Sequence, residues 1–271
     1  MPSVIITGGT GLVGTALSKL LTFQGFSVII LSRDPARHKS QSPSIRYAAW
    51  NIRDQTINEE AIREAKFIIH LAGAGVADKR WTDKRKKEIQ ESRIKSSELL
   101  TKALTKITNK VEAVVSASAI GWYTESAAVQ RVETDPPDPG FLGETCRLWE
   151  QHIQPVTAMG KRLVILRSGI ALSNDGGAFP EFKRPVRFGI ASILGNGRQI
   201  ISWIHMDDLC WLYLEAMINP QWTGIYNAVA PQPVTNKTFM IELGNRMKRS
   251  FYISLPVPGF VLRLLLGEKS T

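Results

Sequence analysis

Cysteine is scarce in this chain, and its few histidines are too dispersed to form a metal site. The sequence has two cysteines among 271 residues, and Cys146 and Cys210 both lie in apolar helical contexts. They fit neither a disulfide framework nor a metal motif, which favours a reducing compartment. The four histidines, at positions 38, 70, 152 and 205, have no ligand-like spacing. We therefore expect no metal site.

Signals for membranes and export are missing too. No apolar stretch approaches the roughly 20 residues that a transmembrane helix needs. The start, MPSVIITGG, has neither the charged region nor the long apolar segment of a signal peptide. With 44% hydrophobic and 21% charged residues, the composition is that of a globular protein. We expect a cytoplasmic protein without a membrane partner.

Basic residues are in excess, with a formal net charge of +10. Part of the excess lies in residues 79–95, KRWTDKRKKEIQESRIK, where acidic residues interleave with the bases. We favour the solvated face of a helix, with one or two of these residues touching a phosphorylated ligand. The sequence shows no recognised nucleic-acid-binding module and no basic strand with interleaved aromatics. We therefore expect no nucleic-acid partner.

Short apolar runs alternate with helical patterns through the first 170 residues. Apolar strands separated by helices indicate a parallel sheet covered on both faces. The predicted fold class is α/β, a Rossmann doubly wound parallel sheet whose ligands bind at the carboxyl ends of the strands. The predicted strands are Val4–Thr7, Ser27–Leu31, Ile45–Ala49, Phe67–Leu71, Ala113–Ser116 and Leu163–Arg167, and the helical patterns lie near 12–24, 58–65, 82–107 and 143–159.

From about residue 172 the pattern changes, because glycine and proline become frequent. Helices near 206–218 and 236–248 then flank a short strand at Gly224–Ala228. We interpret residues 172–271 as a smaller C-terminal α/β lobe on the substrate side. Residues 1–171, with returning segments from about 202–230, would form the nucleotide-binding domain. The chain ends at LRLLLGEKST as though cut inside an apolar helix, so we expect a truncated C-terminus.

A glycine cluster, TGGTGLVG at residues 7–14, lies between the first predicted strand and an amphipathic helix. One glycine allows a tight turn, a second lets the backbone approach a pyrophosphate, and the last lets the helix pack closely on the sheet. The helix then directs its free N–H groups at the phosphates. This context predicts a nucleotide site rather than a plain strand–turn–helix.

The end of the second strand distinguishes two nicotinamide cofactors. A carboxylate there holds the ribose 2′-OH of NAD, whereas an arginine accommodates the 2′-phosphate of NADP. The sequence VIILSRDPAR places Ser32 and Arg33 at the strand end and Asp34 one step beyond. A hydroxyl beside a guanidinium suits a phosphate. We predict NADP(H), and Asp34 keeps NAD(H) as a weaker alternative.

The glycine motif, with HLAGAG at 70–75 and SWIHMDDL at 202–209, resembles the extended short-chain dehydrogenase/reductase superfamily. More narrowly, the chain resembles its atypical branch of epimerase family proteins, which are similar to sugar-nucleotide epimerases. This resemblance covers nearly the whole chain. It rests on LSRDP at 31–35, RWTDKRKKEIQESRIKSSELL at 80–100, SASAIGWY at 116–123, LWE at 148–150, LRSGIALSNDGGAF at 166–179, GNGRQIISWIHMDDL at 195–209, YNAVAPQPVTNKTF at 226–239 and LLLGE at 264–268.

The resemblance implies a set of cofactor contacts. For three of these contacts the residues also allow a purely structural interpretation: Arg93 as an exposed helical base, and Leu71 and Ala72 as part of the strand core. The pyrophosphate loop would comprise Gly8, Thr10, Gly11, Leu12, Val13 and Gly14, and the 2′-phosphate would meet Ser32 and Arg33. The remaining contacts would be Leu71, Ala72, Gly73, Glu88, Arg93 and Ser116, with Arg167, Ser168, Gly169 and Ala171 toward the nicotinamide.

Active members of the superfamily use a Tyr-x-x-x-Lys pair, which this sequence lacks. The helix that should carry the pair reads FLGETC, where Phe141 and Thr145 are the nearest equivalents. Ser118 matches the serine that orients the substrate. Tyr123 is a candidate substitute acid, with loop packing against the second lobe as its alternative. For His205, at the start of a predicted helix, we favour a structural role.

Two functional hypotheses follow. In the first, the protein is an NADP(H)-dependent oxidoreductase or epimerase acting on an unknown small molecule, for which a nucleotide sugar is one candidate. Ser118 would orient the substrate, and Tyr123 or a water would move the proton. In the second, the protein holds NADP(H) as a structural or redox-sensing ligand with little turnover. The missing pair favours the second hypothesis, and the retained serine and the second lobe favour the first. The sequence gives no oligomeric state, so a homodimer stays open.

Overall fold

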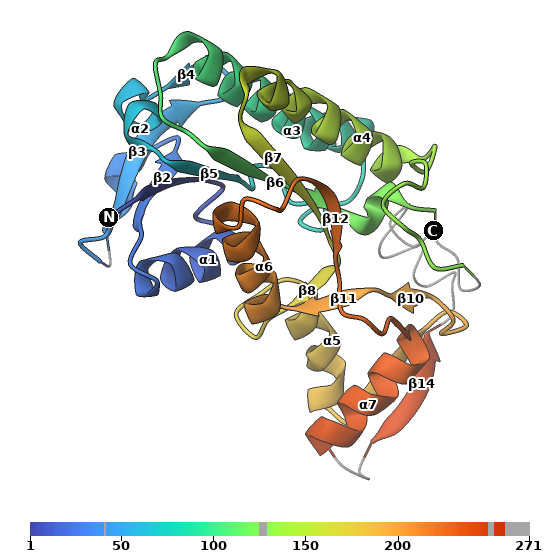
Figure 1. Cartoon of the computed structure of the whole chain (residues 1–271). Helices are drawn as coiled ribbons and strands as arrows, with labels where there is room; N and C mark the ends of the chain where they lie inside the picture. The colour runs from blue at the N-terminus through green and yellow to red at the C-terminus, as the bar shows by residue number, and fades with distance from the viewer. Residues whose placement is uncertain (41, 125–128, 249–251, 258–271) are drawn as a thin grey trace.

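The computed structural model describes residues 1–40, 42–124, 129–248 and 252–257, which form a central sheet between two layers of helices and a small lobe beside it (Figure 1). The sheet has eight strands in the order β12-β7-β6-β5-β1-β2-β3-β4. Every pairing within it is parallel except β3 with β4. The predicted doubly wound sheet is confirmed. Its strands are β1 (Ser3–Thr7), β2 (Ser27–Ser32), β3 (Ile45–Asn51), β4 (Thr56–Ile57), β5 (Phe67–His70), β6 (Ala113–Ala119), β7 (Arg162–Ser168) and β12 (Gly224–Ala228).

The strand order reverses beside β1. From β1 the chain passes through β2 and β3 toward one edge, then returns to β5 on the other side of β1 and continues through β6 and β7. The last residue of β1, Thr7, is paired with Leu31 of β2 and His70 of β5, so these three strands end side by side. In open α/β sheets a reversal of this kind leaves a crevice at the carboxyl ends, where ligands bind.

Helices cover both faces of the sheet and bury alternate residues of each strand. Val4 and Ile6 of β1 pack in the core beneath α1 and α6, whereas Ile5 packs in the opposite core beneath α2 and α3. A strand that is buried on both faces has to be apolar at every position, which explains the unbroken apolar run in β1. The helices of the two layers are α1 (Leu12–Phe23), α2 (Glu59–Glu64), α3 (Asp83–Lys106), α4 (Phe141–Ile153) and α6 (Met206–Ile218).

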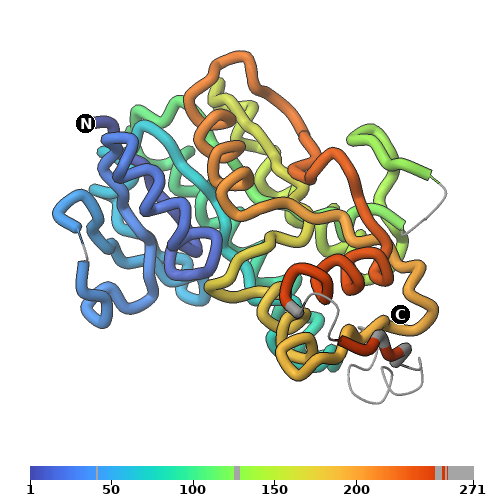
Figure 2. Tube along the Cα trace, turned by 90° about the horizontal axis from the view of Figure 1, so that it is seen from below, coloured from blue at the N-terminus to red at the C-terminus, as the bar shows by residue number. Residues whose placement is uncertain are grey.

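The small lobe has its own core beside the sheet. Val186, Ala191, Ile193 and Met240 are buried there. Both views place α7 on the side of the molecule away from the N-terminus (Figures 1 and 2). The small lobe consists of α5 (Ala178–Arg187), β9 (Ile190–Leu194), α7 (Asn236–Lys248) and β14 (Ile253–Val257), and short strands connect it to the sheet: β8 (Ile170–Leu172) paired with β11 (Trp203–His205), and β10 (Ile200–Ile201) paired with β13 (Val234–Thr235).

The structure departs from the expected elements in two places. Helix α5 occupies part of the glycine- and proline-rich segment, where no helix was predicted, and Pro185 lies in the last turn of that helix, two residues before its end. The helix expected near 143–159 ends at Ile153, and a 3₁₀ segment containing Pro155 follows. The expected C-terminal apolar helix lies outside the described residues. Within the described ranges, no helix is long and apolar enough to cross a membrane.

The basic run at residues 79–95 is mostly a solvated face of α3, as expected. Arg85 pairs with Glu88 at 2.7 Å. Glu91 lies between two lysines, Lys87 and Lys95, at distances of 3.8 and 3.0 Å. Ion pairs at this spacing on an exposed helix contribute only a few tenths of a kcal/mol each, about 0.2–0.5. These pairs neutralise part of the local positive charge, and the segment stays net basic.

Candidate functional site

The glycine loop joins β1 to α1 with almost no room for side chains. Gly8 has a φ of +71°, and a Cβ added there would lie 3.0 Å from the carbonyl carbon of Leu71. A Cβ added at Gly14 would lie 2.5 Å from the carbonyl oxygen of Gly8. Helix α1 has Gly11 as its N-cap, with no side-chain cap and no acidic residue in its first turn. Its first N–H groups therefore face the crevice without a side-chain acceptor, as an anion site requires.

The loop's remaining predicted contacts lie at its tip and along the start of α1. Thr10 and Gly11 are exposed, and Leu12 and Val13 are half-buried. Leu12 also touches the segment that leads to α5, because a Cβ added at Gly177 would lie 3.1 Å from its side chain. The structure thus brings the loop next to the beginning of the small lobe.

A buried polar network supports the loop from below. The Thr7 hydroxyl accepts hydrogen bonds from the N–H groups of Leu71 and Ala72, at 3.1 and 3.2 Å, so its single proton goes to Nδ1 of His70 at 2.8 Å. Nε2 of His70 therefore carries the ring proton and donates it to the Ser97 hydroxyl at 3.1 Å. Burial lowers the pKa of His70 to about 3. The imidazole is neutral and ties the ends of β1 and β5 to α3.

The end of β2 carries the residues predicted to read the 2′-phosphate. Ser32 is buried, and its hydroxyl lies 2.9 Å from Nε2 of His38. Arg33 is exposed at the same strand end. Asp34, the residue that would favour NAD, pairs with Arg37 at 2.8 Å. This arrangement offers a hydroxyl and a guanidinium, while the carboxylate is already paired.

The loop after β5 rests on Arg93 of α3. Arg93 is buried and donates to the carbonyl oxygens of Ala74 and Ile89, and its guanidinium stacks 4.7 Å from the Trp149 ring. A Cβ added at Gly73 would lie 3.0 Å from the Arg93 guanidinium carbon. Arg93 is therefore not an exposed helical base, and its observed contacts shape the loop.

Three other residues predicted along this path have different surroundings. Glu88 is exposed and pairs with Arg85, whose hydrogen bond lowers the pKa of the Glu88 carboxyl. Leu71 and Ala72 pack against the cores on the two faces of the sheet, so both contribute to strand packing as well as to the crevice.

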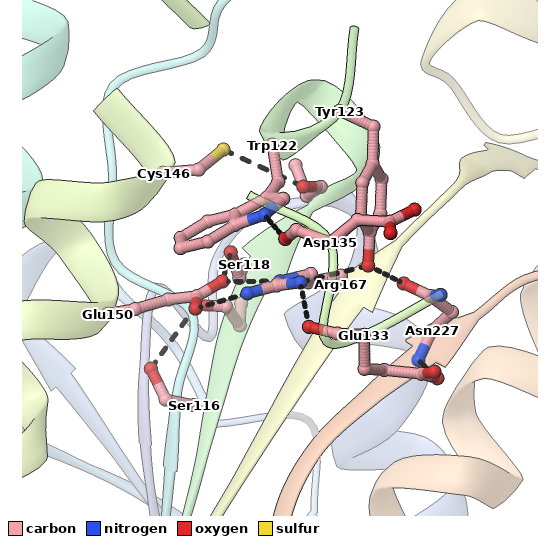
Figure 3. A network of polar contacts seen from close by, with 12 residues as sticks. Ser116, Ser118, Trp122, Tyr123, Glu133, Asp135, Cys146, Glu150, Arg167 and Asn227 are labelled. Atoms are coloured by element: carbon pink, nitrogen blue, oxygen red, sulfur yellow. Dashed lines mark hydrogen bonds and ion pairs between the residues drawn. The ribbon is translucent and has the colours of Figure 1, made fainter. Parts of the chain in front are cut away.

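A second polar cluster lies where β6, β7 and β12 end (Figure 3). The strand register aligns Ser118 of β6 with Arg167 of β7, and Arg167 with Asn227 of β12. Arg167 donates from Nε and Nη2 to the two carboxylate oxygens of Glu150, both at 2.9 Å. Ser118 donates to the same carboxylate at 2.6 Å. The ion pair is almost completely buried, with Arg167 1% exposed and Glu150 6% exposed.

Tyr123 closes this cluster. Its hydroxyl accepts a hydrogen bond from Nη1 of Arg167 at 2.9 Å and donates one to Oδ1 of Asn227 at 2.7 Å. The Trp122 ring covers the Arg167 guanidinium at 3.7 Å. Burial raises the pKa of the Tyr123 phenol, while the guanidinium of Arg167 acts in the opposite direction. The phenol therefore carries its proton at neutral pH.

Phe141 and Thr145, the predicted equivalents of the missing catalytic pair, have no acid–base group. The Phe141 ring packs edge-on against Trp81, with centroids 5.1 Å apart, and Thr145 donates to the Phe141 carbonyl. Ser116 is completely buried. His205 caps α6 by accepting the N–H of Asp207, in agreement with a structural role. Ser168 ends β7, Gly169 follows it and Ala171 lies in β8; all three are half-buried.

Sequence reasoning missed Glu150 and Asn227 as members of this cluster. Glu150 lies on the buried stripe of α4 with Cys146, Trp149 and Ile153, and an acidic residue at a core position of an amphipathic helix signals a buried partner. Asn227 had no such signal, because its place beside Arg167 depends on the pairing of β12 with β7. Within the described residues no cluster could hold a metal ion, and burial raises the pKa of the Cys146 thiol to about 11.

Comparison with known proteins identifies the family of this chain. The model of the NAD dependent epimerase/dehydratase family matches residues 4–149. Epimerase family protein YfhF of Bacillus subtilis is 35% identical over 269 residues, which cover 99% of this chain and 86% of that protein. This chain belongs to that family. The crystal structure of human epimerase family protein SDR39U1 (isoform 2) with NADPH is also similar, with a TM-score of 0.82 and 29% identity over 99% of this chain and 87% of that chain. A nucleoside-diphosphate sugar epimerase from Corynebacterium glutamicum gives a TM-score of 0.76 and 32% identity, covering 98% of this chain and 55% of that one.

Proposed function

We propose that this family member binds NADP(H) in the crevice and acts as an oxidoreductase or epimerase on a small molecule. The observation that carries the cofactor assignment is the end of β2, where Ser32 and an exposed Arg33 lie side by side and Asp34 pairs with Arg37. A guanidinium and a hydroxyl stabilise a 2′-phosphate. The related human protein crystallised with NADPH supports the same choice.

The residues of the crevice fit a dinucleotide. The glycine loop is a cradle that a Cβ at Gly8 or Gly14 would fill, and the first turn of α1 presents N–H groups without a side-chain cap. When bound, the nicotinamide supplies or accepts a hydride. The chain's own residues would hold the phosphates with the loop and α1, and place the substrate near the ends of β6 and β7.

The experiment is a fluorescence titration of the protein with NADPH and NADH, alongside Arg33→Ala. We expect tight NADPH binding that weakens about tenfold or more in the variant, because a hydrogen bond to a charged group contributes about 1.5–3 kcal/mol. Binding of NADH should change little. The matched control is Arg63→Ala, since Arg63 is an exposed arginine in the last turn of α2, just before β5 begins, and so lies near the amino ends of the strands, away from Arg33. Failure of both nicotinamides to bind would refute the proposal.

A second candidate function is a binding protein that holds NADP(H) with little turnover. The replacement of the catalytic pair by Phe141 and Thr145 favours it, because neither side chain exchanges protons at neutral pH. The two functions separate in an absorbance assay of NADPH consumption with a panel of aldehydes, quinones and nucleotide sugars. Cofactor binding without consumption across that panel would select the binding protein.

A further inference from the structure

Burying the ion pair of Arg167 and Glu150 carries a large desolvation cost. Two charges removed from water are stabilised only by excellent geometry, and apolar residues of similar size often serve stability equally well. The pair lies at the carboxyl ends of β6 and β7, beneath α4 and next to a tyrosine hydroxyl. A contribution to stability alone therefore does not explain why the pair lies at this position.

Each nitrogen of the guanidinium has a defined partner. Nε and Nη2 hold the Glu150 carboxylate in a bidentate pair, and Nη1 donates to the Tyr123 hydroxyl and to the Glu133 carbonyl, the latter at 3.1 Å. Ser118 fixes the carboxylate from β6. The guanidinium is thus oriented from α4 and β6, covered by Trp122, and pointed at one phenol oxygen (Figure 3).

We propose that Arg167, held by Glu150, is a positioning residue that takes the place of the missing lysine and makes Tyr123 the proton donor for a carbonyl substrate. The inference rests on the proposed function and deepens it by naming the substrate class. In the reductive direction bound NADPH would supply a hydride to the carbonyl carbon, while the phenol gives its proton to the carbonyl oxygen. The phenolate that remains is stabilised by Arg167 until it takes a proton from water. Asn227, which accepts the phenol proton here, gives way to the carbonyl oxygen.

The charged groups that face Tyr123 come from three elements. Arg167 on β7 contacts the hydroxyl, Glu150 on α4 lies behind Arg167, and Glu133 approaches from the segment before α4. Arg167 stabilises the phenolate, whereas Glu133 disfavours it. Glu133 is itself engaged, because it accepts the backbone N–H of Asn227 at 2.7 Å. Removing the Arg167–Glu150 pair should therefore shift the ionisation of Tyr123 to higher pH.

The first test follows that ionisation directly. Protein labelled with 3-fluorotyrosine is titrated by ¹⁹F NMR, and Tyr123→Phe assigns the resonance. The double variant Arg167→Met/Glu150→Met removes both charges together, so neither is left buried alone and the fold is retained. We expect the Tyr123 resonance to titrate at least one pH unit higher in the double variant, while Tyr226, the neighbour of Asn227 on β12, is unchanged. An unmoved Tyr123 titration would overturn the proposal.

The second test measures proton donation with 9,10-phenanthrenequinone as the carbonyl probe at saturating NADPH. Tyr123→Phe should lower the rate of NADPH oxidation about a hundredfold or more, and the double variant about tenfold. Tyr226→Phe removes the phenol hydroxyl of the residue before Asn227, which accepts the Thr223 N–H away from this cluster, and should leave the rate unchanged. Equal rates in Tyr123→Phe and the parent protein, or no quinone-dependent oxidation by a parent that binds NADPH, would refute the role of Tyr123. The fluorescence titration reads NADPH binding separately, so a failed cofactor assignment is recognised by itself.

Discussion

At the scale of single residues, Gly8 and Gly160 form a natural matched pair. Both have left-handed backbone, with φ of +71° and +70°. A Cβ added at Gly160 would meet nothing within 4 Å, whereas one at Gly8 would press on the backbone of Leu71 and Ala72 at 3.0–3.2 Å. The two positions therefore share the conformational penalty for a side chain and differ in the close approach.

We predict that Gly160→Ala lowers the free energy of unfolding by about 1 kcal/mol, the usual penalty of a left-handed non-glycine residue. Gly8→Ala should lower it by about 2–3 kcal/mol, because the added methyl group also displaces the neighbouring backbone. It should also weaken NADPH binding at least tenfold. Urea unfolding and nicotinamide fluorescence measure the two effects. If both substitutions lowered the free energy of unfolding equally and NADPH affinity stayed intact, the close approach of Gly8 to the backbone of Leu71 and Ala72 would contribute neither to stability nor to cofactor binding.

At the scale of elements, His70 joins β1, β5 and α3 through a neutral imidazole. Nδ1 has to accept the Thr7 proton, so protonation of the ring breaks that hydrogen bond. The folded protein takes up this proton only near pH 3, whereas an unfolded histidine takes it up near pH 6.5. Below about pH 6.5 the unfolded state therefore binds the extra proton, and stability falls as the pH falls, by at most about 1.4 kcal/mol per pH unit, until about pH 3.

The prediction is tested by urea unfolding between pH 4.5 and 7.5 for the parent protein and His70→Gln. We expect His70→Gln to have a lower free energy of unfolding at pH 7.5. Its free energy of unfolding should also fall less steeply on acidification, and the difference in slope should correspond to at most one proton bound on unfolding. His152→Gln removes a half-buried imidazole of α4 that lies beside Glu98 of α3, outside the His70 network, and is the control. Parallel pH profiles for the parent protein and His70→Gln would contradict the assignment.

The elements of the sheet were predictable, and those of the small lobe were only partly so. Strands β1, β2 and β5 are buried on both faces, and continuous burial leaves an unbroken apolar run that can be read locally. Strands β10 and β13 have two residues each, and their pairing is set by contacts between distant segments. The glycine loop was readable for the same local reason as the strands. The cluster around Arg167 was not, because three strands and α4 contribute to it.

At the scale of the whole molecule, the chain forms two cores around the sheet and a separate core in the small lobe. The cores around the sheet contain the apolar residues of β1, β2 and β5, whereas among the described residues of the small lobe four apolar side chains are fully buried. Connections between the two run through β8 and β11, which pair with each other. Because little apolar surface is buried in the small lobe, we expect it to open more readily than the sheet.

Met240 and Met217 test this difference, since both are buried, at 1% and 0% exposure, in α7 and α6 respectively. Replacing a buried methionine by alanine costs about 2–5 kcal/mol. We predict that Met240→Ala speeds hydrogen exchange in α5, β9 and α7 while amides of β1 and the NADPH affinity are unchanged. Met217→Ala should instead lower the global free energy of unfolding and speed exchange in the sheet. If Met240→Ala exposes β1 as much as Met217→Ala does, the two sets of cores unfold as one unit, and the small lobe cannot move over the crevice independently of the sheet.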